Sequence, residues 1–141
     1  MARPAWLEIY RHYEVISCVE AATARGINLA TELKTLLLTA NSRVIAVHLR
    51  GDRRLDNGRL RRLFNARVSF LPAQEVALHG LRAGAINPWN IEFCRVHVIS
   101  ASVLALPHMA TNNSARDEGI LFNTSELRKL PNVVIADIER D

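Results

Sequence analysis

The stretch Leu33 to Leu38 constrains the fold of this chain most strongly, because it is apolar and has the length of a buried strand. One residue inside it, Lys34, carries a charge. Side chains alternate between the two faces of a strand, so Lys34 shares a face with Leu36 and Ala40. An ammonium group there either extends to water past the strand end or points into a polar cavity, where it would hold an anionic group.

Composition indicates one globular domain covering residues 1–141, with 49% hydrophobic and 23% charged residues. No apolar run approaches the roughly 20 residues that span a bilayer, and the first residues lack the apolar core of a signal peptide. We therefore expect a cytoplasmic protein with no membrane partner. Cys18 and Cys94 have no metal-ligand spacing, so we expect reduced thiols and no metal or other cofactor. The net charge of +4 favours an anionic partner.

The order of elements predicts an α+β domain, in which a mixed, mostly antiparallel sheet is flanked by short helices. Ser17-Cys18-Val19-Glu20 has the pattern of a capping box and begins a helix that Gly26 ends. Residues 33–40 and 44–49 are expected to be strands, joined into a hairpin by the turn Asn41-Ser42.

Other elements are expected along the chain from capping and turn signals. A first helix is expected over residues 4–12 and a short strand over 13–16. Asn57 is expected to cap a helix that ends near Phe64, and Asn123 to Glu126 to form a second capping box. Further strands are expected at 67–71, 94–100, 119–122 and 133–138, a short helix at 73–78, loops at 50–54 and 79–90, and extended or looped chain at 107–113.

Several segments follow one another in an order that resembles a known superfamily. They are an alanine-containing helix, Lys34-Thr35-Leu36, Gly51-Asp52-Arg53-Arg54-Leu55-Asp56, Pro72-Ala73-Gln74-Glu75-Val76 and Gly84-Ala85-Ile86-Asn87-Pro88. The set is similar to the YbaK and prolyl-tRNA synthetase editing-domain superfamily of aminoacyl-tRNA deacylases, over roughly residues 17–137. The resemblance implies a mixed sheet flanked by helices and the hydrolysis of mischarged tRNA.

The resemblance also implies roles for individual residues. A lysine at the position of Lys34 contacts the tRNA 3′ end, and the loop from Gly84 to Pro88 lines the aminoacyl pocket. Ile86 is the one sizeable apolar side chain of that loop and is our candidate for the pocket wall. We therefore expect Lys34 and Gly84 to act in catalysis, and Ile86, Pro88 and Thr35 to bind the substrate.

The segment Pro107-His108-Met109-Ala110-Thr111-Asn112 is similar to the alanyl-tRNA(Pro) deacylase branch, in which a histidine precedes a Thr-Asn pair. The resemblance implies a catalytic role for His108 and a substrate-binding role for Asn112. Thr35, which follows the lysine, is more similar to the YbaK branch than to the branch that tends to have asparagine there.

The residues themselves favour hydrolysis by water rather than by a protein nucleophile. No serine has a neighbouring base and acid at the spacing of a catalytic triad, and neither cysteine has a motif that would support a thiolate. An aminoacyl ester is already activated, so positioning and stabilisation of the oxyanion can suffice. Backbone N–H groups near Gly84 could face the carbonyl oxygen, and family analogy supplies a water oriented by the ribose 2′-OH.

Basic residues of the segment 50–62 either form a solvated surface or contact tRNA phosphates. The candidates for tRNA binding are Arg50, Arg53, Arg54, Arg59 and Arg62.

The sequence thus predicts a free-standing deacylase that removes a small amino acid, Ala or Cys on tRNA(Pro), and whose partners are the tRNA acceptor end and an aminoacyl-tRNA synthetase. Two alternatives stay open: a non-catalytic module that binds tRNA or a synthetase, and a small-ligand domain unrelated to tRNA.

Overall fold

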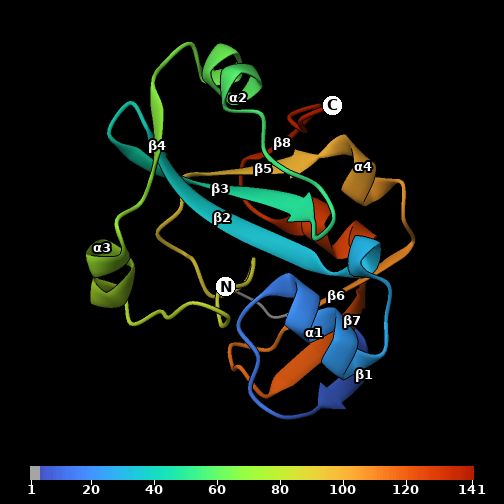
Figure 1. The fold of residues 1–141 in the computed structure, drawn as a ribbon. Helices are drawn as coiled ribbons and strands as arrows, with labels where there is room; N and C mark the ends of the chain where they lie inside the picture. Colours follow the sequence, from blue (N-terminus) through green and yellow to red (C-terminus); the bar gives the residue numbers. More distant parts are fainter. Residues whose placement is uncertain (1–3) are drawn as a thin grey trace.

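Two sheets and a set of short helices form the fold in the computed structural model, which describes residues 4–141 (Figure 1). The helices are α1 (Cys18–Arg25), α2 (Asn57–Phe64), α3 (Ala73–Leu78) and α4 (Ala101–Leu104), with 3-10 helices η1 (Leu29–Thr31) and η2 (Thr124–Lys129). The strands are β1 (Trp6–Arg11), β2 (Leu33–Ala40), β3 (Arg43–Arg50), β4 (Val68–Phe70), β5 (Val96–Ser100), β6 (His108–Asn112), β7 (Glu118–Asn123) and β8 (Val133–Ala136).

The predicted α+β class is confirmed, and the strands are divided between two sheets. The larger sheet has the order β4-β2-β3-β5-β8, and the smaller has the order β1-β7-β6. β2 is antiparallel to β3 and β4, whereas β3, β5 and β8 are parallel to one another. The smaller sheet is antiparallel throughout.

The hairpin β2-β3 is the centre of the larger sheet, and its turn was predictable from the sequence. Asn41 and Ser42 both have positive φ, 52° and 62°. A two-residue turn of that kind matches the right-handed twist of the strands that it joins. The pairing sets Lys34 opposite Leu49 and Thr35 opposite His48.

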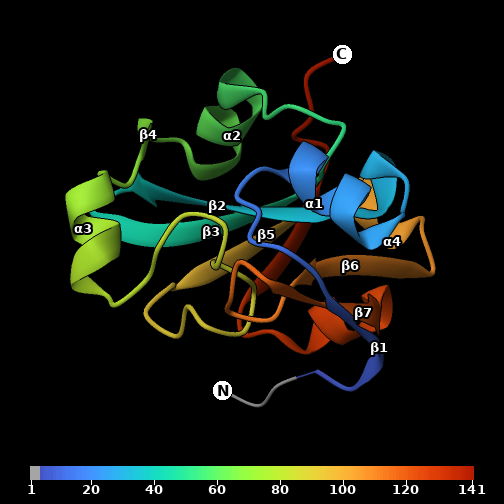
Figure 2. The same cartoon turned by 60° about the horizontal axis from the view of Figure 1, so that its bottom comes forward.

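The larger sheet is covered on both faces (Figure 2). On one face Leu38, Val47 and Val98 pack against Leu60 of α2 and Ile138 of the C-terminal segment. On the other face lie the smaller sheet and the long loop between α3 and β5. The buried residues of the first contact include Leu33, Ile99, Met109, Ile120 and Phe122, and those of the second are Leu37, Ala46, Leu71, Ile91 and Cys94.

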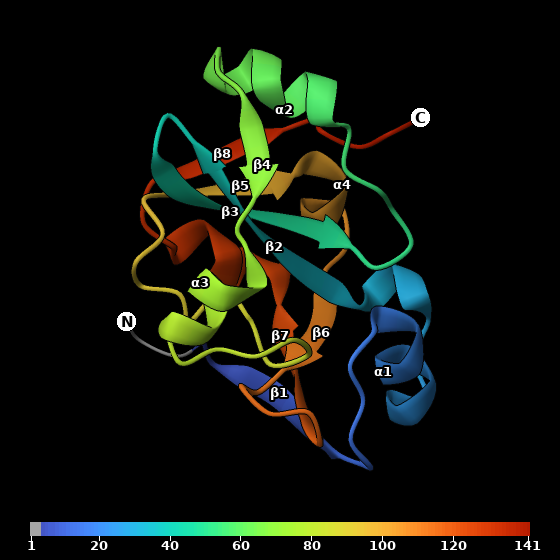
Figure 3. The ribbon, with the colours of Figure 1, turned by 60° about the vertical axis from the view of Figure 1, so that its left-hand side comes forward.

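The short strand β4 leaves part of β2 open. β4 pairs only with Leu38, Thr39 and Ala40, so the first half of β2 has no neighbour from β4. The loop after α3 runs from the β4 side towards α1 (Figure 3). The open half of β2, α1 and this loop together form the surroundings of the candidate site.

Two predictions for the N-terminal segment are wrong. Residues 4–12 contain the strand β1 rather than a helix, because pairing with β7 supplies backbone hydrogen bonds that a helix of this length could not match in stability. Residues 13–16 are not a strand. They still lie beside the segment that precedes β7, since the Val15 N–H donates to the Arg116 carbonyl at 2.8 Å.

Two capping predictions are also wrong in detail. Asp56, rather than Asn57, caps α2, and its side chain accepts from the Arg59 N–H at 3.0 Å. The second predicted capping box does not form, and a 3-10 helix stands in place of the expected α-helix. Glu126 instead accepts from the Ala5 N–H at 2.9 Å, which ties the N-terminal segment to η2.

Candidate functional site

A cavity of about 260 Å³ lies where α1, the start of β2, the loop after α3 and the end of β6 meet. Five of the residues predicted from the sequence line it: Lys34, Thr35, Gly84, Ile86 and Asn112. The remaining lining residues are Val15, Ile16, Ser17, Cys18, Ala21, Arg25, Glu32, Leu33 and Ala83. Residues up to 97 positions apart in the sequence are thus brought to one cavity by the packing of α1, the loop after α3 and strands of the two sheets.

Lys34 is half-buried on the open half of β2. Its ammonium group donates a hydrogen bond to the carbonyl of Arg53, in the loop that follows β3. Burial lowers the pKa of Lys34, and the nearby Arg54 lowers it further, whereas Cys18 and Asp52 oppose the shift. A partly desolvated ammonium that lines a cavity is placed to bind an anionic or polar group.

Gly84 brings the loop after α3 against the segment before α1. Its φ is +83°, and an added Cβ would lie 3.0 Å from Ile16 Cα and 3.1 Å from the Val15 carbonyl oxygen. Both the backbone conformation and the close approach therefore require glycine. The backbone at Gly84 lies on the cavity wall without a side chain to cover it.

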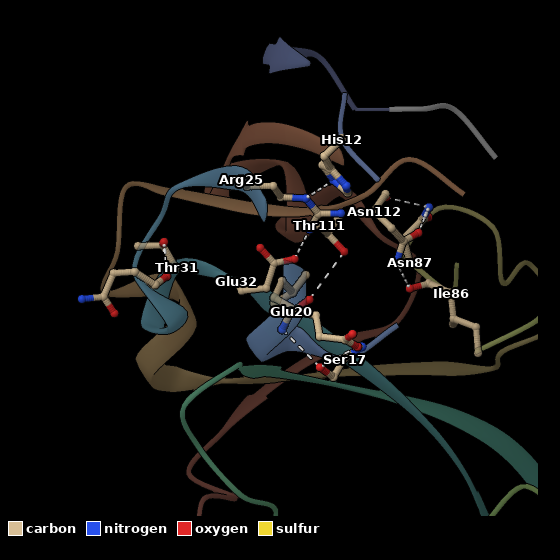
Figure 4. A network of polar contacts seen from close by, with 12 residues as sticks. His12, Ser17, Glu20, Arg25, Thr31, Glu32, Ile86, Asn87, Thr111 and Asn112 are labelled. Carbon is tan, nitrogen blue, oxygen red and sulfur yellow. Dashed lines mark hydrogen bonds and ion pairs between the residues drawn. The ribbon is translucent and has the colours of Figure 1, made fainter. Parts of the chain in front are cut away.

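Asparagine side chains hold this loop in place (Figure 4). Asn112 donates through Nδ2 to the Ile86 carbonyl at 2.7 Å. Asn87 is buried, and its Nδ2 donates to the Asn112 carbonyl at 3.2 Å and to Ser114 Oγ at 3.0 Å. Pro88 is also buried and does not line the cavity. Asn112 thus fixes the position of Ile86, a structural role that the sequence did not indicate.

A buried polar chain extends from the cavity across the larger sheet. Thr35 Oγ1 lies 2.9 Å from His48 Nδ1, and His48 Nε2 lies 3.0 Å from His97 Nδ1. Both histidines are fully buried. Burial lowers the pKa of His48 to about 3 and that of His97 to about 4, so both imidazoles are neutral near pH 7.

His97, at the end of this polar chain away from the cavity, determines the direction of the hydrogen bonds. His97 Nε2 is buried and has no hydrogen-bond partner among residues 4–141. A buried N–H without a partner is rarer than a bare acceptor, so we assign the His97 proton to Nδ1, which donates to His48. His48 then carries its proton on Nδ1 and donates to Thr35. The Thr35 hydroxyl then accepts from His48, and its own proton is available to an acceptor in the cavity that Thr35 lines.

An ion pair between Arg25 and Glu32 forms a further wall of the cavity (Figure 4). The Arg25 guanidinium donates to Glu32 Oε1, and the two side chains are 1% and 3% exposed. Arg25 Nε also donates to His12 Nε2 at 3.2 Å. Neither residue of the pair was predicted from the sequence, because an arginine at a helix end and a glutamate before a strand are usually exposed.

Cys18 lines the cavity but is not suited to nucleophilic attack. Burial and the nearby Glu32 raise the pKa of its thiol to about 11. The thiol is therefore protonated near neutral pH, whereas a nucleophilic cysteine needs a lowered pKa. Within the part of the chain that the structure describes, no group of three or more His, Cys, Asp or Glu side chains is arranged to hold a metal ion, and no helix is long and apolar enough to cross a membrane.

His108 lies away from the cavity. It is the exposed first residue of β6, whereas Asn112 at the other end of that strand lines the cavity. The structure therefore does not bring His108 together with Lys34 and Gly84.

The arginines proposed to bind tRNA fall into two groups. Arg50 pairs with Asp52 at 2.7 Å, Arg53 with Glu139 at 3.7 Å, and Arg59 with three acids. The side chains of Arg54 and Arg62 are exposed and make no ion pair with any described residue. α2, which carries Arg59 and Arg62, lies well away from α1 in Figures 1 and 3.

The buried histidines predict a loss of stability in acid. Their pKa values return to about 6.5 in the unfolded chain, so the unfolded state binds more protons as the pH falls from 6.5 towards 4. We expect urea denaturation to show a loss of about 1.6 kcal/mol per histidine between pH 6.5 and pH 5. The double variant His48→Leu/His97→Leu should lack this loss. Glu32, whose pKa is raised, acts in the opposite direction in both proteins and cancels. If the unmodified protein and the double variant lose the same stability as the pH falls, the buried neutral histidines are not the cause of the loss.

A matched pair of glycines tests the close approach of the loop. Gly80 has a φ of +75° with nothing within 4 Å of an added Cβ, whereas the Cβ of Gly84→Ala would meet Ile16 and Val15. Gly80→Ala and Gly84→Ala should each lower the free energy of unfolding by about 1–2 kcal/mol, because alanine is strained in the left-handed backbone conformation. Gly84→Ala should lower it further, because of the close contact. Thermal or urea unfolding measures the difference, and equal losses would show that the contact with residues 15–16 is not a constraint.

Comparison with known proteins agrees with this geometry. A model of the aminoacyl-tRNA editing domain matches residues 12–130, whereas no curated protein matches the chain. Among solved structures, hypothetical protein APE2540 superposes with a TM-score of 0.86 at 24% identity, over 96% of this chain and 92% of that chain. A protein proposed as a trans-editing enzyme for prolyl tRNA synthetase gives 0.85 at 20% identity, over 96% and 87%. A proposed signal transduction protein from Marinobacter aquaeolei VT8 gives 0.74 at 16% identity, over 98% and 28%.

At these identities the solved structures establish the fold. The family model covers most of the chain, and it confirms the resemblance found in the sequence. The chain belongs to the aminoacyl-tRNA editing domain family.

Proposed function

We propose that this protein is a trans-editing deacylase that hydrolyses the ester of a tRNA mischarged with a small amino acid, Ala or Cys on tRNA(Pro) being the leading candidates. The observation that carries the proposal is that Lys34, Thr35, Gly84 and Ile86 line one small cavity in a chain of the editing-domain family.

In the proposed reaction, each part of the cavity takes one part of the substrate. Lys34 binds the phosphate or ribose of the terminal nucleotide, which places the ester in the cavity. Backbone N–H groups at Gly84 face the carbonyl oxygen, where negative charge develops in the transition state. Ile86, fixed through its carbonyl by Asn112, limits the size of the amino acid. Size exclusion is effective against a larger cognate residue and weak against smaller ones.

Water is the proposed nucleophile. Its oxygen attacks the carbonyl carbon, the bond to the ribose oxygen breaks, and the proton passes to that oxygen through the adjacent 2′-OH. The protonated thiol of Cys18 supports this choice over a covalent intermediate. His108 lies outside the cavity, so a contribution from it would act on the tRNA rather than on the aminoacyl group.

The test is deacylation measured across Ala-, Cys-, Ser- and Pro-charged tRNA, with the two lysines of the chain as a matched pair. Lys34→Ala should lower the rate on the preferred ester at least a hundredfold with little loss of stability, because it breaks no ion pair and the Arg53 carbonyl that loses its donor is at an exposed position. Lys129→Ala should retain full activity, since Lys129 lies on η2 and pairs with Glu126 at the surface.

Full activity in a folded Lys34→Ala variant would remove Lys34 from the site. Binding of tRNA without release of any amino acid would favour the non-catalytic module, and neither binding nor turnover would favour the unrelated small-ligand domain.

The two groups of arginines give a second test. If the basic surface follows phosphates, Arg54→Gln and Arg62→Gln should each weaken binding to all tRNAs alike and reduce the salt slope by about one. Arg59→Gln should change the slope less, because three carboxylates already compensate its charge. Salt titrations of tRNA binding measure the slopes, and unchanged slopes in all three variants would mean that this surface is only solvated.

A further inference from the structure

Glu32 has one carboxylate oxygen that is buried and has no partner among the described residues. The residue is 2% exposed and lines the cavity. Its Oε1 accepts from Arg25, whereas its Oε2 is buried and makes no hydrogen bond with the described part of the chain. A buried charged oxygen without a donor costs free energy. Such an oxygen beside a cavity points to a donor that arrives with the ligand.

The position of Glu32 is fixed by three separate elements. Its N–H donates to the Leu29 carbonyl of η1 at 3.1 Å, and its carbonyl accepts from the Gly51 N–H at 2.6 Å. A bridge of the parallel type joins it to Ala110 of β6. The carboxylate is therefore held in place before a ligand binds, which reduces the entropy lost on binding.

Arg25, the partner of Glu32, is fixed as well. Its Nε donates to His12, and His12 Nδ1 lies 2.6 Å from the Tyr13 carbonyl. Gly119 of β7 leaves the space that Arg25 occupies, since an added Cβ would lie 2.3 Å from Arg25 Nε. Arg25 thus donates to Oε1 of Glu32, and Oε2 is left for a second hydrogen-bond donor.

The charge and size of the cavity select the kind of donor. An anionic group would be repelled by the carboxylate, whereas a compact cation with several N–H groups can donate to Oε2. Burial raises the pKa of Glu32 to about 7 even though Arg25 opposes the shift, so a second cation would hold the carboxylate ionised. In an aminoacyl ester the group that fits is the α-ammonium.

We propose that Glu32 binds the α-ammonium group of the aminoacyl ester through Oε2, an inference that rests on the deacylase function proposed above. Glu32 and Lys34 are two residues apart, about 7 Å along an extended chain. The carboxylate then takes the cationic end of the substrate and the lysine takes the anionic end, which orients the ester between them. Glu32 is a substrate-binding residue in this scheme and does not transfer a proton.

The test compares two esters that differ at the ammonium group. Alanyl-tRNA and lactyl-tRNA have side chains of the same size, but lactyl-tRNA carries a hydroxyl in place of the ammonium. Each enzymatic rate is divided by the spontaneous rate of the same ester at the same pH. The unmodified protein should favour alanyl-tRNA by about ten- to hundredfold, the range for one hydrogen bond to a charged group.

Variants assign this preference to Glu32. Glu32→Gln should lower the alanyl rate more than the lactyl rate, so that the preference for alanyl-tRNA is lost; a fall common to both esters reports the loss of the ion pair with Arg25. Glu118→Gln removes a carboxylate that pairs with Arg11 and does not line the cavity, so it should keep the full preference. Circular dichroism checks folding, because Glu32→Gln leaves Arg25 buried without a counter-charge.

The possible results separate this inference from the function on which it rests. Hydrolysis of both esters by the unmodified protein without preference overturns the role of Glu32 and leaves the deacylase intact, and this result requires no variant. An equal fall of both rates in a folded Glu32→Gln variant also overturns it, because the preference for alanyl-tRNA would then survive without the carboxylate. Hydrolysis of neither ester overturns the deacylase, and the role of Glu32 with it.

Discussion

The buried ion pair between Arg25 and Glu32 is the interaction on which the geometry of the site depends. It joins the end of α1 to the residue before β2, and Gly119 of the smaller sheet leaves room for it. Removing one partner of a buried pair costs about 3–5 kcal/mol, because the other charge is left uncompensated. The pair therefore fixes α1 against both sheets, and the N-terminal turn of α1 becomes one wall of the cavity.

A second constraint is the mismatch in length between β2 and β4. The eight residues of β2 are fully paired with β3, but β4 covers only the last three on the other side. The open half begins with Leu33, Lys34 and Thr35, all of which line the cavity. An open sheet edge normally invites pairing with another strand. Here α1 and the loop that carries Gly84 lie beside it, so the edge serves as the floor of a site.

Local signals in the sequence predicted much of this arrangement. The capping box of α1 forms as expected, and the turn of the β2-β3 hairpin lies at Asn41-Ser42 as predicted. Prediction failed where a distant segment determined the structure. Residues 4–12 have a helical spacing of apolar side chains, yet they pair with β7, more than a hundred positions away. Such pairing outweighs local propensity, and one sequence does not reveal it.

His48, His97 and Glu32, which were not predicted as site residues, show what a sequence can and cannot reveal about a buried polar site. Lys34 was found because a charge interrupts an apolar strand, and the histidines of β3 and β5 interrupt apolar strands in the same way. Their spacing in the sequence is not that of metal ligands, but the register places His48 directly opposite Thr35. Glu32 carries no such signal, since a glutamate before a strand is ordinary until its burial is known. Polar residues at inward positions of adjacent strands, aligned by a predicted hairpin, can therefore point to a buried network, whereas a single acid at an element boundary cannot.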